Sequence, residues 1–591
     1  MRPTAHFLPT GLAILGLVCL GWFLSCAISD LRERALDDAF ITYNYARSVA
    51  EGGGIRFNAT DPDPTDGASS LLHLAVTAVA IKLGFDPLVS TRAVGLTLFL
   101  AVPLILGPVV ARVTRVPLGV GLLCAAAAWT GLALAPETGW HLAAGMETIL
   151  FVFVHVAAAC WAVWFALAPG RPGIAAAAIG PLVLTLLTTA RPEGLLLAGA
   201  YLMLVPILRS GMASPVSGSG FGRRWIVVAV AFALMAGAVL AWKVWYFGHL
   251  LPNAYYVKSR SGVFGTAGDL LPGARFVLVF LVMRYIPLAI LVGVWAAVLG
   301  VSVRARSLAG VVLLPVLGVV LLYARAIHET AGAFRYEYPY LVTLYGCVAL
   351  LFGVQWQRSR VAFGWMLALG VSCVPALAPL PLMQQSLRAP WSMAVEWTRH
   401  ERVGDALALL GRDLGETRLG QNATILLGGA GQVPYYSRFK AIDWVGLNTT
   451  YLSGRYPLTI AQVWEYVDAE RPDVIYSVLP PAAAGARDRH SDPGFLSPSV
   501  RSTLDGRGSE LMRRWDPDRV AEMFYREMQY VRDYYEFGAA YGLPSDWALM
   551  AYVRKDSPHR DVLQRVLKAS RRADWQLDLT QHYRVDPRAL H

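Results

Sequence analysis

The chain has 591 residues, of which 55% are hydrophobic and only 16% are charged, and its mean hydropathy is +0.45. A soluble protein of this size cannot bury so many apolar side chains, and apolar runs long enough to cross about 30 Å of hydrocarbon recur along the sequence. The net charge of +11 does not indicate nucleic-acid binding, because arginines that flank membrane helices account for much of it. The natural partners for the remaining positive charge are anionic membrane lipids or a phosphate-bearing substrate.

The apolar segments predict a polytopic helical membrane protein with about 11 spans. The first segment is too long and leucine-rich for a typical signal peptide, so we expect a retained helix. The segments are 8–28, 68–83, 91–111, 118–135, 147–168, 173–190, 193–208, 225–246, 275–300, 308–324, 339–355 and 361–381.

The arginines between segments predict the topology. Loop 209–224, Arg304 with Arg306, and Arg358 with Arg360 mark cytoplasmic loops, which places the loops 247–274 and 325–338 outside. Strict alternation through every segment would put Arg112 and Arg115 outside as well, against the charge rule. One segment therefore does not span, either 68–83, which contains His73 and Lys82, or one of the proline-containing pair within 173–208.

Residues 384–591 are polar and predict one α/β domain outside the membrane, after a transmembrane domain over 1–383. All six cysteines lie in apolar runs, so this tail has no disulfide. We expect strands at 424–427, 441–444 and 474–478, and helices at 461–469 and 520–537.

Asp37 and Asp38 follow the first apolar segment and open the polar first outer loop, 29–67. Acids beside a membrane are seldom without a function, so we expect a catalytic site at the membrane surface, and the pair could also hold a divalent cation such as Mg²⁺, Mn²⁺ or Ca²⁺. A capped interfacial helix is the alternative. Tyr43 and Arg47 are further candidates in this loop. If residues 38–51 are helical, Tyr45 and Arg47 cannot share one face with both acids.

Further polar residues stand at the outer ends of later segments. Glu147 opens an apolar run, and Arg191 and Glu193 stand between two others, where such groups pair or face a polar cavity. Cations in the outer loops suit a phosphate. The candidates for donor and phosphate binding are Arg191, Glu193, His249, Asn253, Tyr256, Lys258, Arg335 and Tyr336.

Several strings together resemble a known family, the GT-C class of polytopic glycosyltransferases that use a polyprenyl-phosphate sugar donor. They are most similar to its bacterial branch that includes the actinobacterial terminal arabinofuranosyltransferases. The strings are DDAFITYNYARSVAEGGGIRFN (37–58), GMET (145–148), ARPEGLLLA (190–198), YFGHLLPNAYYVK (246–258), FRYEYPYL (334–341), GGAGQVPYYSRFKAIDWVGLN (428–448) and RPDVI (471–475).

The resemblance implies an enzyme of the bacterial cytoplasmic membrane whose active site and C-terminal domain face outward. It implies a polyprenyl-phosphate donor, a glycan or glycoconjugate acceptor, and an Asp of the first outer loop as the base. The order of the motif favours Asp37 as base and Asp38 as its support. The string DPDPTDGASSLLH lacks an aromatic that the family usually carries after the triglycine, which leaves the sugar and acceptor open. A transporter or flippase, or a polymerase of lipid-linked glycans, is the alternative function.

Overall fold

A computed structural model describes most of the chain. The described residues are 4–30, 36–133, 135–167, 173–210, 219–259, 274–300, 316–321, 323, 335–361, 363, 402–427, 429–453, 459–479, 530–531, 533–542 and 548–569.

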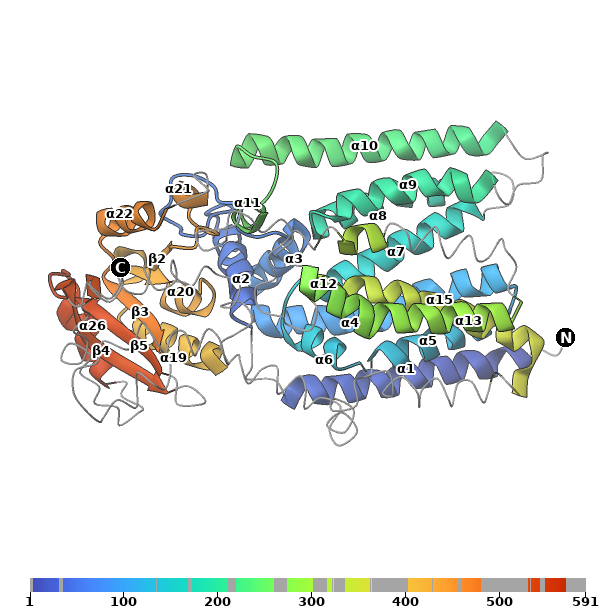
Figure 1. The fold of residues 1–591 in the computed structure, drawn as a ribbon, viewed down its shortest axis with the longest axis horizontal. Coiled ribbons are helices and arrows are strands. Elements are labelled where there is room, and N and C mark those ends of the chain that lie inside the picture. Colours follow the sequence, from blue (N-terminus) through green and yellow to red (C-terminus); the bar gives the residue numbers. More distant parts are fainter. Residues whose placement is uncertain are drawn as a thin grey trace.

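The first two thirds of the chain form a bundle of long helices that run side by side (Figure 1). Its helices are α1 (Thr4–Asp30), α4 (Pro87–Thr114), α5 (Leu118–Ala133), α6 (Pro136–Ala143), α7 (Thr148–Ala166), α8 (Ile174–Ala190), α9 (Gly194–Ser210), α10 (Ser219–Phe247), α12 (Ala274–Phe280), α13 (Ile286–Val298) and α15 (Tyr338–Arg358), with a π-helical turn, η1 (Leu281–Tyr285), between α12 and α13. By length and apolar character, α4, α7, α10 and α15 can each cross a membrane within the described part of the chain, and α5 with α6 forms a fifth candidate that is bent by 85°.

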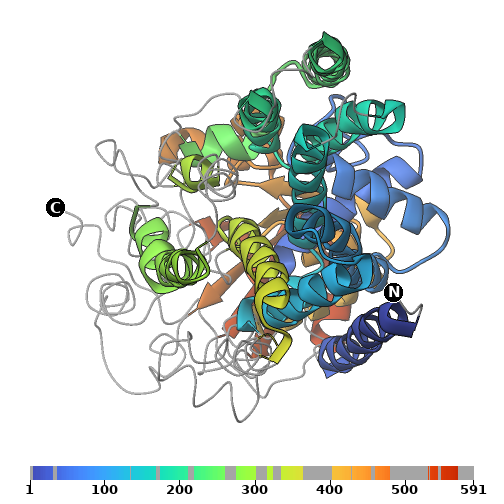
Figure 2. The ribbon, with the colours of Figure 1, turned by 90° about the vertical axis from the view of Figure 1, so that its right-hand side faces the viewer.

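The rim of the bundle is apolar. Both ribbon views place α10 at the edge (Figures 1 and 2), and its side chains Ile226, Val230, Leu234 and Trp245 are exposed. Apolar side chains that face outward from a helix bundle are expected where lipid replaces water. These observations confirm the predicted polytopic helical membrane fold.

Of the two candidates for a segment that does not span, the structure favours 68–83. It forms α3 (Leu71–Lys82), whose 12 residues extend only about 18 Å. With α2 (Asp37–Ala50) it lies across one end of the bundle (Figure 1). Removing α3 from the alternation brings Arg112 and Arg115 to the same end as the later arginines. More than half of the predicted segment 308–324 and almost all of 361–381 lie outside the described residues.

Hydrogen bonds show that the basic helix ends meet. Arg112 at the end of α4 donates to the Leu167 carbonyl (3.0 Å), and Arg209 at the end of α9 donates to the Ala166 carbonyl (3.2 Å). Gln357 of α15 donates to the Arg115 carbonyl (3.3 Å). Because α4, α7, α9 and α15 all finish at this end, they all begin at the opposite end, beside α2 and the acidic motifs.

The C-terminal part is an α/β unit beyond the α2 end of the bundle (Figure 1). Its five-stranded sheet has the order β2-β1-β3-β5-β4, with β1 parallel to β2 and β3, and β5 antiparallel to β3 and β4. The elements are α19 (Arg402–Glu416), β1 (Thr424–Leu427), α20 (Gln432–Ser437), β2 (Lys440–Asp443), α21 (Thr450–Ser453), α22 (Ile460–Glu470), β3 (Val474–Leu479), β4 (Tyr535–Gly542), β5 (Ala548–Arg554) and α26 (Arg560–Ala569).

Helices cover both faces of this sheet. Ile425 and Leu427 of β1 pack with Leu410 of α19 and Leu563 of α26. Leu426, between them in sequence, packs on the opposite face with residues of α22. This alternation follows from the two-residue period of a strand. A sheet buried on both sides explains why β1 and β3 consist mainly of apolar residues.

The predicted strands 424–427, 441–444 and 474–478 and the helix 461–469 correspond to β1, β2, β3 and α22. The predicted helix 520–537 is wrong at its end, because Tyr535–Phe537 begin β4, while residues 520–529 lie outside the described part. Tyr535 pairs with Arg554 and Phe537 pairs with Tyr552 of β5, so residues 535–537 form a strand. Such cross-strand pairing outweighs the local helical pattern.

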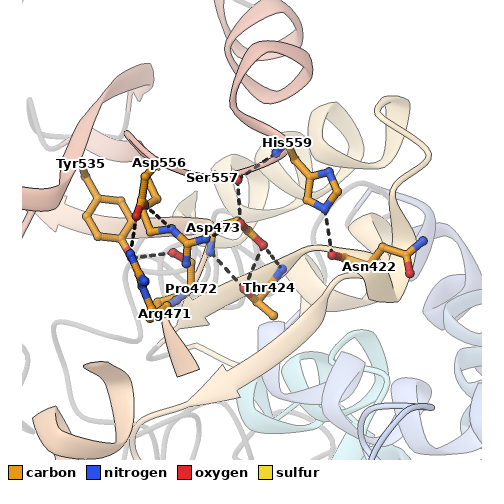
Figure 3. Close-up of polar contacts among 10 residues, drawn as sticks. Asn422, Thr424, Arg471, Pro472, Asp473, Tyr535, Asp556, Ser557 and His559 are labelled. Atoms are coloured by element: carbon orange, nitrogen blue, oxygen red, sulfur yellow. Dashed lines mark hydrogen bonds and ion pairs between the residues drawn. The ribbon is translucent and has the colours of Figure 1, made fainter. Parts of the chain in front are cut away.

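Asp473 of the RPDVI string joins three strands (Figure 3). Its carboxylate accepts hydrogen bonds from the backbone and hydroxyl of Thr424 (2.9 and 3.0 Å) and from the Ser557 hydroxyl (2.7 Å), and Arg554 lies 3.4 Å away. Thr424 begins β1, Arg554 ends β5 and Ser557 precedes α26. Asp473 therefore has a structural role in the sheet.

We expect Asp473→Ala to weaken the sheet by about 1–3 kcal/mol, because several buried donors would lose their acceptor. Native-state hydrogen exchange of the β1 and β5 amides measures this local free energy. The control is Ser557→Ala, which loses one of these bonds and should cost about 1 kcal/mol or less. Equal effects of the two changes would contradict the central role of Asp473.

Candidate active site

The two acids of the first outer loop diverge because they are neighbours on a helix. Adjacent side chains on an α-helix point about 100° apart. Asp37 and Asp38 are the first two residues of α2, where the helix dipole favours acids. Asp37 turns toward the C-terminal unit and Asp38 toward the bundle, as their partners show.

Asp38 forms an ion pair with Arg335, whose Nη1 donates to its Oδ2 at 3.0 Å. The side chain of Asp38 is 40% exposed and that of Arg335 is 17% exposed. One side of this pair is thus open to molecules from outside the protein. The Arg335 guanidinium also lies over the Tyr336 ring, 5.8 Å from its centroid.

Glu147 links Arg335 to Arg191 beneath this opening. Arg191 donates to Glu147 Oε1 through Nε (3.1 Å) and Nη2 (2.9 Å), and Arg335 Nη2 lies 3.6 Å from the same oxygen. Burial alone would raise the pKa of Glu147, but Arg335 and Arg191 outweigh it and hold that pKa well below its usual range. Glu147 is therefore ionised and positions both guanidiniums.

Glu193 completes the row on the other side of Arg191. Its Oε1 lies 3.7 Å from Arg191 Nη1, and it accepts a hydrogen bond from the Tyr323 hydroxyl. Arg191 Nη1 also donates to the Arg335 carbonyl at 3.3 Å. Five of the predicted site residues are thus in one cluster, which we call the acid–arginine cluster: Asp38, Glu147, Arg191, Glu193 and Arg335.

The cluster lies where three bundle helices begin. Glu147 precedes α7, Arg191 and Glu193 precede α9, and Arg335 precedes α15. Helix N-termini carry partial positive charge, which favours anions there. The same chain direction in these helices brings residues that are far apart in sequence to one place.

Asp37 instead attaches α2 to the C-terminal unit. Its Oδ2 accepts from the Gly431 N–H (3.1 Å) and its Oδ1 accepts from the Gln432 N–H (2.7 Å). A Cβ at Gly431 would lie 1.8 Å from the Asp37 carbonyl oxygen, so this approach requires glycine. Burial raises the pKa of Asp37 to about 6; the nearby Asp38 adds to this shift, and the two N–H donors oppose it.

Arg47 serves the same attachment. It donates to the Tyr435 carbonyl, lies 4.7 Å from the centroid of the Tyr435 ring, and donates to Asn44 (2.9 Å). Asn44 in turn donates to the Gly431 carbonyl (3.2 Å). Asp37, Asn44 and Arg47 recur at helical spacing on one face of α2. In the structure Arg47 holds α20 and has no contact with the acid–arginine cluster among the described interactions.

Tyr43 connects the first motif to the GMET string. Its buried hydroxyl donates to the Gly145 carbonyl (2.8 Å) and bonds to Thr91 Oγ1 (2.7 Å). Gly145 has a φ of +73°, and a Cβ there would lie 2.4 Å from the Tyr43 hydroxyl. Tyr43 thereby sets the turn that places Glu147 at the start of α7.

The remaining candidates lie apart from the cluster. Asn253 of α11 (Asn253–Ser259) donates to the Leu447 carbonyl (3.1 Å), so it joins α11 to the C-terminal unit. His249 bonds to the Leu251 carbonyl (2.8 Å) and its ring lies 5.7 Å from that of Tyr256. Lys258 belongs to α11, and its side chain lies outside the described part of the structure.

The described residues contain no group of three or more His, Cys, Asp or Glu that could hold a metal ion. The predicted cation site of Asp37 and Asp38 needs both acids to face one point. Their carboxylates point to different partners, since both oxygens of Asp37 accept from backbone N–H groups. The arrangement therefore does not fit the predicted paired site.

Solved structures share this architecture. ArnT from Cupriavidus metallidurans, bound to undecaprenyl phosphate, matches with a TM-score of 0.53 at 14% identity, over 92% of this chain and 98% of that one; its apo state gives the same values. The chain has the GT-C fold. The apo oligosaccharyltransferase of Archaeoglobus fulgidus matches with a TM-score of 0.45 at 11% identity, over 92% of this chain and 75% of that one.

Sequence comparison adds one match. Residues 395–548 fit the model of a domain of unknown function, DUF8728. No curated protein matches the sequence. The GT-C fold is therefore known from the structure, and the arabinofuranosyltransferase branch remains a prediction from the motifs.

Two buried polar features were missed by the sequence interpretation. The sequence analysis considered His73 only as a polar residue that disfavours a membrane span over 68–83. In the structure His73 is buried in the first turn of α3. Asp66 pairs with Lys243 at 2.8 Å, with both side chains nearly buried. The sequence shows Lys243 only as a charged residue near the end of an apolar segment. Its partner Asp66 is far away in sequence, so the ion pair could not be predicted.

The raised pKa of Asp37 makes the attachment of α2 depend on pH. On folding, the pKa of Asp37 rises from 3.8 to about 6. Protonation of Asp37 therefore stabilises the folded protein fully below pH 3.8, and this stabilisation is lost as the pH rises through about 6. We expect Asp37→Asn, which is always neutral, to lose less thermal stability than wild type as the pH rises from about 4 to about 6. Thermal unfolding of the full chain measures this difference.

The control for this experiment is Asp63→Asn, which alters an exposed acid in the same loop. Its pH profile should match wild type. A wild-type profile in Asp37→Asn as well would contradict the assignment of the pH dependence to Asp37.

Proposed function

We propose that this protein is a membrane glycosyltransferase that transfers a sugar from a polyprenyl-phosphate donor to a glycan acceptor. The observation that carries the proposal is the partly exposed Asp38 paired with Arg335 at the helix N-termini of a GT-C fold. The binding of undecaprenyl phosphate by ArnT supports a lipid-phosphate donor for a chain of this fold. The motif resemblance favours arabinofuranose as the sugar and a cell-envelope glycan as the acceptor.

The chemistry assigns a role to each member of the cluster. Asp38 accepts the proton of the acceptor hydroxyl, and the acceptor oxygen forms a bond to C1 of the sugar. The bond from C1 to the phosphate oxygen breaks, and the polyprenyl phosphate leaves with the electron pair. A phosphate leaving group needs stabilised charge rather than a proton, and Arg335, held by Glu147, supplies it.

Asp38 is the better base on geometric grounds. A general base must reach the hydroxyl proton, and geometry comes before pKa in choosing it. Both Asp37 oxygens already accept backbone hydrogen bonds, whereas the side chain of Asp38 is 40% exposed. This reverses the roles that the motif order favoured: Asp38 is the base, and Asp37 supports it by anchoring α2.

The charge distribution supports the predicted orientation in a bacterial cytoplasmic membrane. Arg112, Arg115 and Arg209 lie at one end of the bundle, and positive residues favour the cytoplasmic side. The acid–arginine cluster and the C-terminal unit then face outward, and a boundary near residue 383 separates membrane and outer domains. The outer domain, attached through α2 and α20, would hold the acceptor glycan beside Asp38.

A transporter or flippase is disfavoured by the position of these charges. Transporters place their substrate site near the middle of the membrane. Here Asp38, Glu147, Arg191 and Arg335 gather where the bundle helices begin, beside the C-terminal unit. This position suits a reaction at the membrane surface.

We expect Asp38→Asn to slow sugar transfer by about 10²–10⁴-fold, because the amide cannot accept the hydroxyl proton. The matched variant Asp37→Asn should retain most of the rate. The measurement is transfer from a purified polyprenyl-phosphate sugar to cell-envelope glycan, with mass spectrometry of the product. A large loss in Asp37→Asn beside near-normal Asp38→Asn would return the base to Asp37.

For the orientation, an alkaline phosphatase reporter fused after His591 should be active, because this enzyme works outside the cytoplasm. The same reporter placed after Arg209 should be inactive, since that residue lies at the basic end of the bundle. Activity in the second fusion and none in the first would invert the proposed topology.

A further inference from the structure

His73 is a buried histidine beside the acid–arginine cluster. It lies in the first turn of α3, and only 4% of its surface is exposed. Neither ring nitrogen has a hydrogen-bond partner among the described residues. Buried polar side chains in native proteins nearly always have a partner, so each exception needs an explanation such as a missing ligand.

The electrostatic neighbours of His73 place it at the proposed site. Burial lowers its pKa to about 4, with Glu147 opposing and Arg335 adding to this effect. The imidazole is therefore neutral near pH 7 and carries one N–H donor. Its ring centroid lies 6.5 Å from that of Tyr43, the residue that sets the Glu147 turn.

Arg335 has an unused donor as well. Its Nη1 binds Asp38, whereas its buried Nε has no hydrogen-bond partner among the described residues. His73 and the largely covered Arg335, which influence each other electrostatically, thus each have an unmatched buried nitrogen. Such donors suit an acceptor that offers several lone pairs.

We propose that His73 and Arg335 together bind a phosphate oxygen of the lipid-linked donor, with His73 as a neutral hydrogen-bond donor. The proposal rests on the glycosyltransferase function above and adds the residue that completes its phosphate site. Formal charge explains the need for such a donor. The cluster has two guanidiniums against three carboxylates, so charge attraction alone does not hold a phosphate.

A phosphate suits the unmatched nitrogens of His73 and Arg335 better than a metal ion or a sugar hydroxyl does. A metal ion needs several ligands, and the described residues form no group of three that could supply them. The positive N-termini of α7, α9 and α15 favour an anion over a neutral sugar hydroxyl. A hydrogen bond to a charged oxygen is also the stronger kind, so it compensates best for burying the imidazole.

The test measures binding of two lipids to the full chain in nanodiscs. Undecaprenyl phosphate carries the phosphate, and undecaprenol has the same tail without it. We expect His73→Phe to weaken binding of undecaprenyl phosphate by about tenfold or more and to leave undecaprenol binding unchanged. His73→Asn and His73→Gln place an amide N–H near the positions of Nδ1 and Nε2, so one of them should restore part of the affinity.

Thr77→Val is the matched control on the same helix. Thr77 is buried one turn beyond His73, and its hydroxyl already bonds to the His73 carbonyl (2.8 Å). This variant removes a buried polar group that has a partner, so its phosphate binding should match wild type. Thermal unfolding of every variant shows that the fold is retained.

Unchanged phosphate binding in His73→Phe would overturn the proposal and assign the His73 nitrogens to water. An equal loss for both lipids, or no recovery in either amide variant, would also overturn it, because the role would be packing. Wild-type protein that does not prefer undecaprenyl phosphate to undecaprenol would instead overturn the proposed donor, and the His73 proposal with it. The two failures are therefore distinguishable.

Discussion

The structure depends on one short helix, α2, whose first two residues are acids that point in different directions. Asp37 accepts two backbone hydrogen bonds from the start of α20, and Asp38 pairs with Arg335 at the start of α15. The angle of about 100° between neighbouring helix residues makes this division possible. A single helix turn thus joins the membrane bundle, the C-terminal unit and the candidate site. A rotation of α2 would break both connections at once.

The buried charges beneath Asp38 are stable only as a group. Arg191 and Glu147 are almost fully buried, and removing one partner of such a pair typically costs about 3–5 kcal/mol. Replacing the pair with apolar residues would often be neutral for stability, so its presence points to function. Glu147 contacts both arginines and fixes the positions of their guanidiniums. In the proposed reaction this preorganisation matters most, because the arginines need not move when phosphate charge develops.

The same geometry divides the motifs into two kinds. The RPDVI and GGAG strings join strands and bring α20 to α2, as Asp473 and Gly431 show. The strings around Glu147, Arg191 and Arg335 provide charged groups to one site. Tyr43 and Arg47 also connect parts of the fold, since Tyr43 bonds to Gly145 and Arg47 bonds to Tyr435, although both stand near the acids in sequence. Nearness in the chain was therefore a poor guide to which residues act together.

The sequence by itself determined the membrane fold, most helices and three strands, because hydropathy and residue periodicity are local properties of the chain. It also singled out Asp38, Glu147, Arg191 and Arg335, since charges at membrane boundaries are rare. Only the tertiary structure decided that α3 does not span, that Asp37 is an anchor and that Tyr535 begins a strand. It alone showed that His73 is buried, with Glu147 and Arg335 as electrostatic neighbours. Each of these depends on contacts between distant segments, and such contacts leave no periodic signal in the sequence.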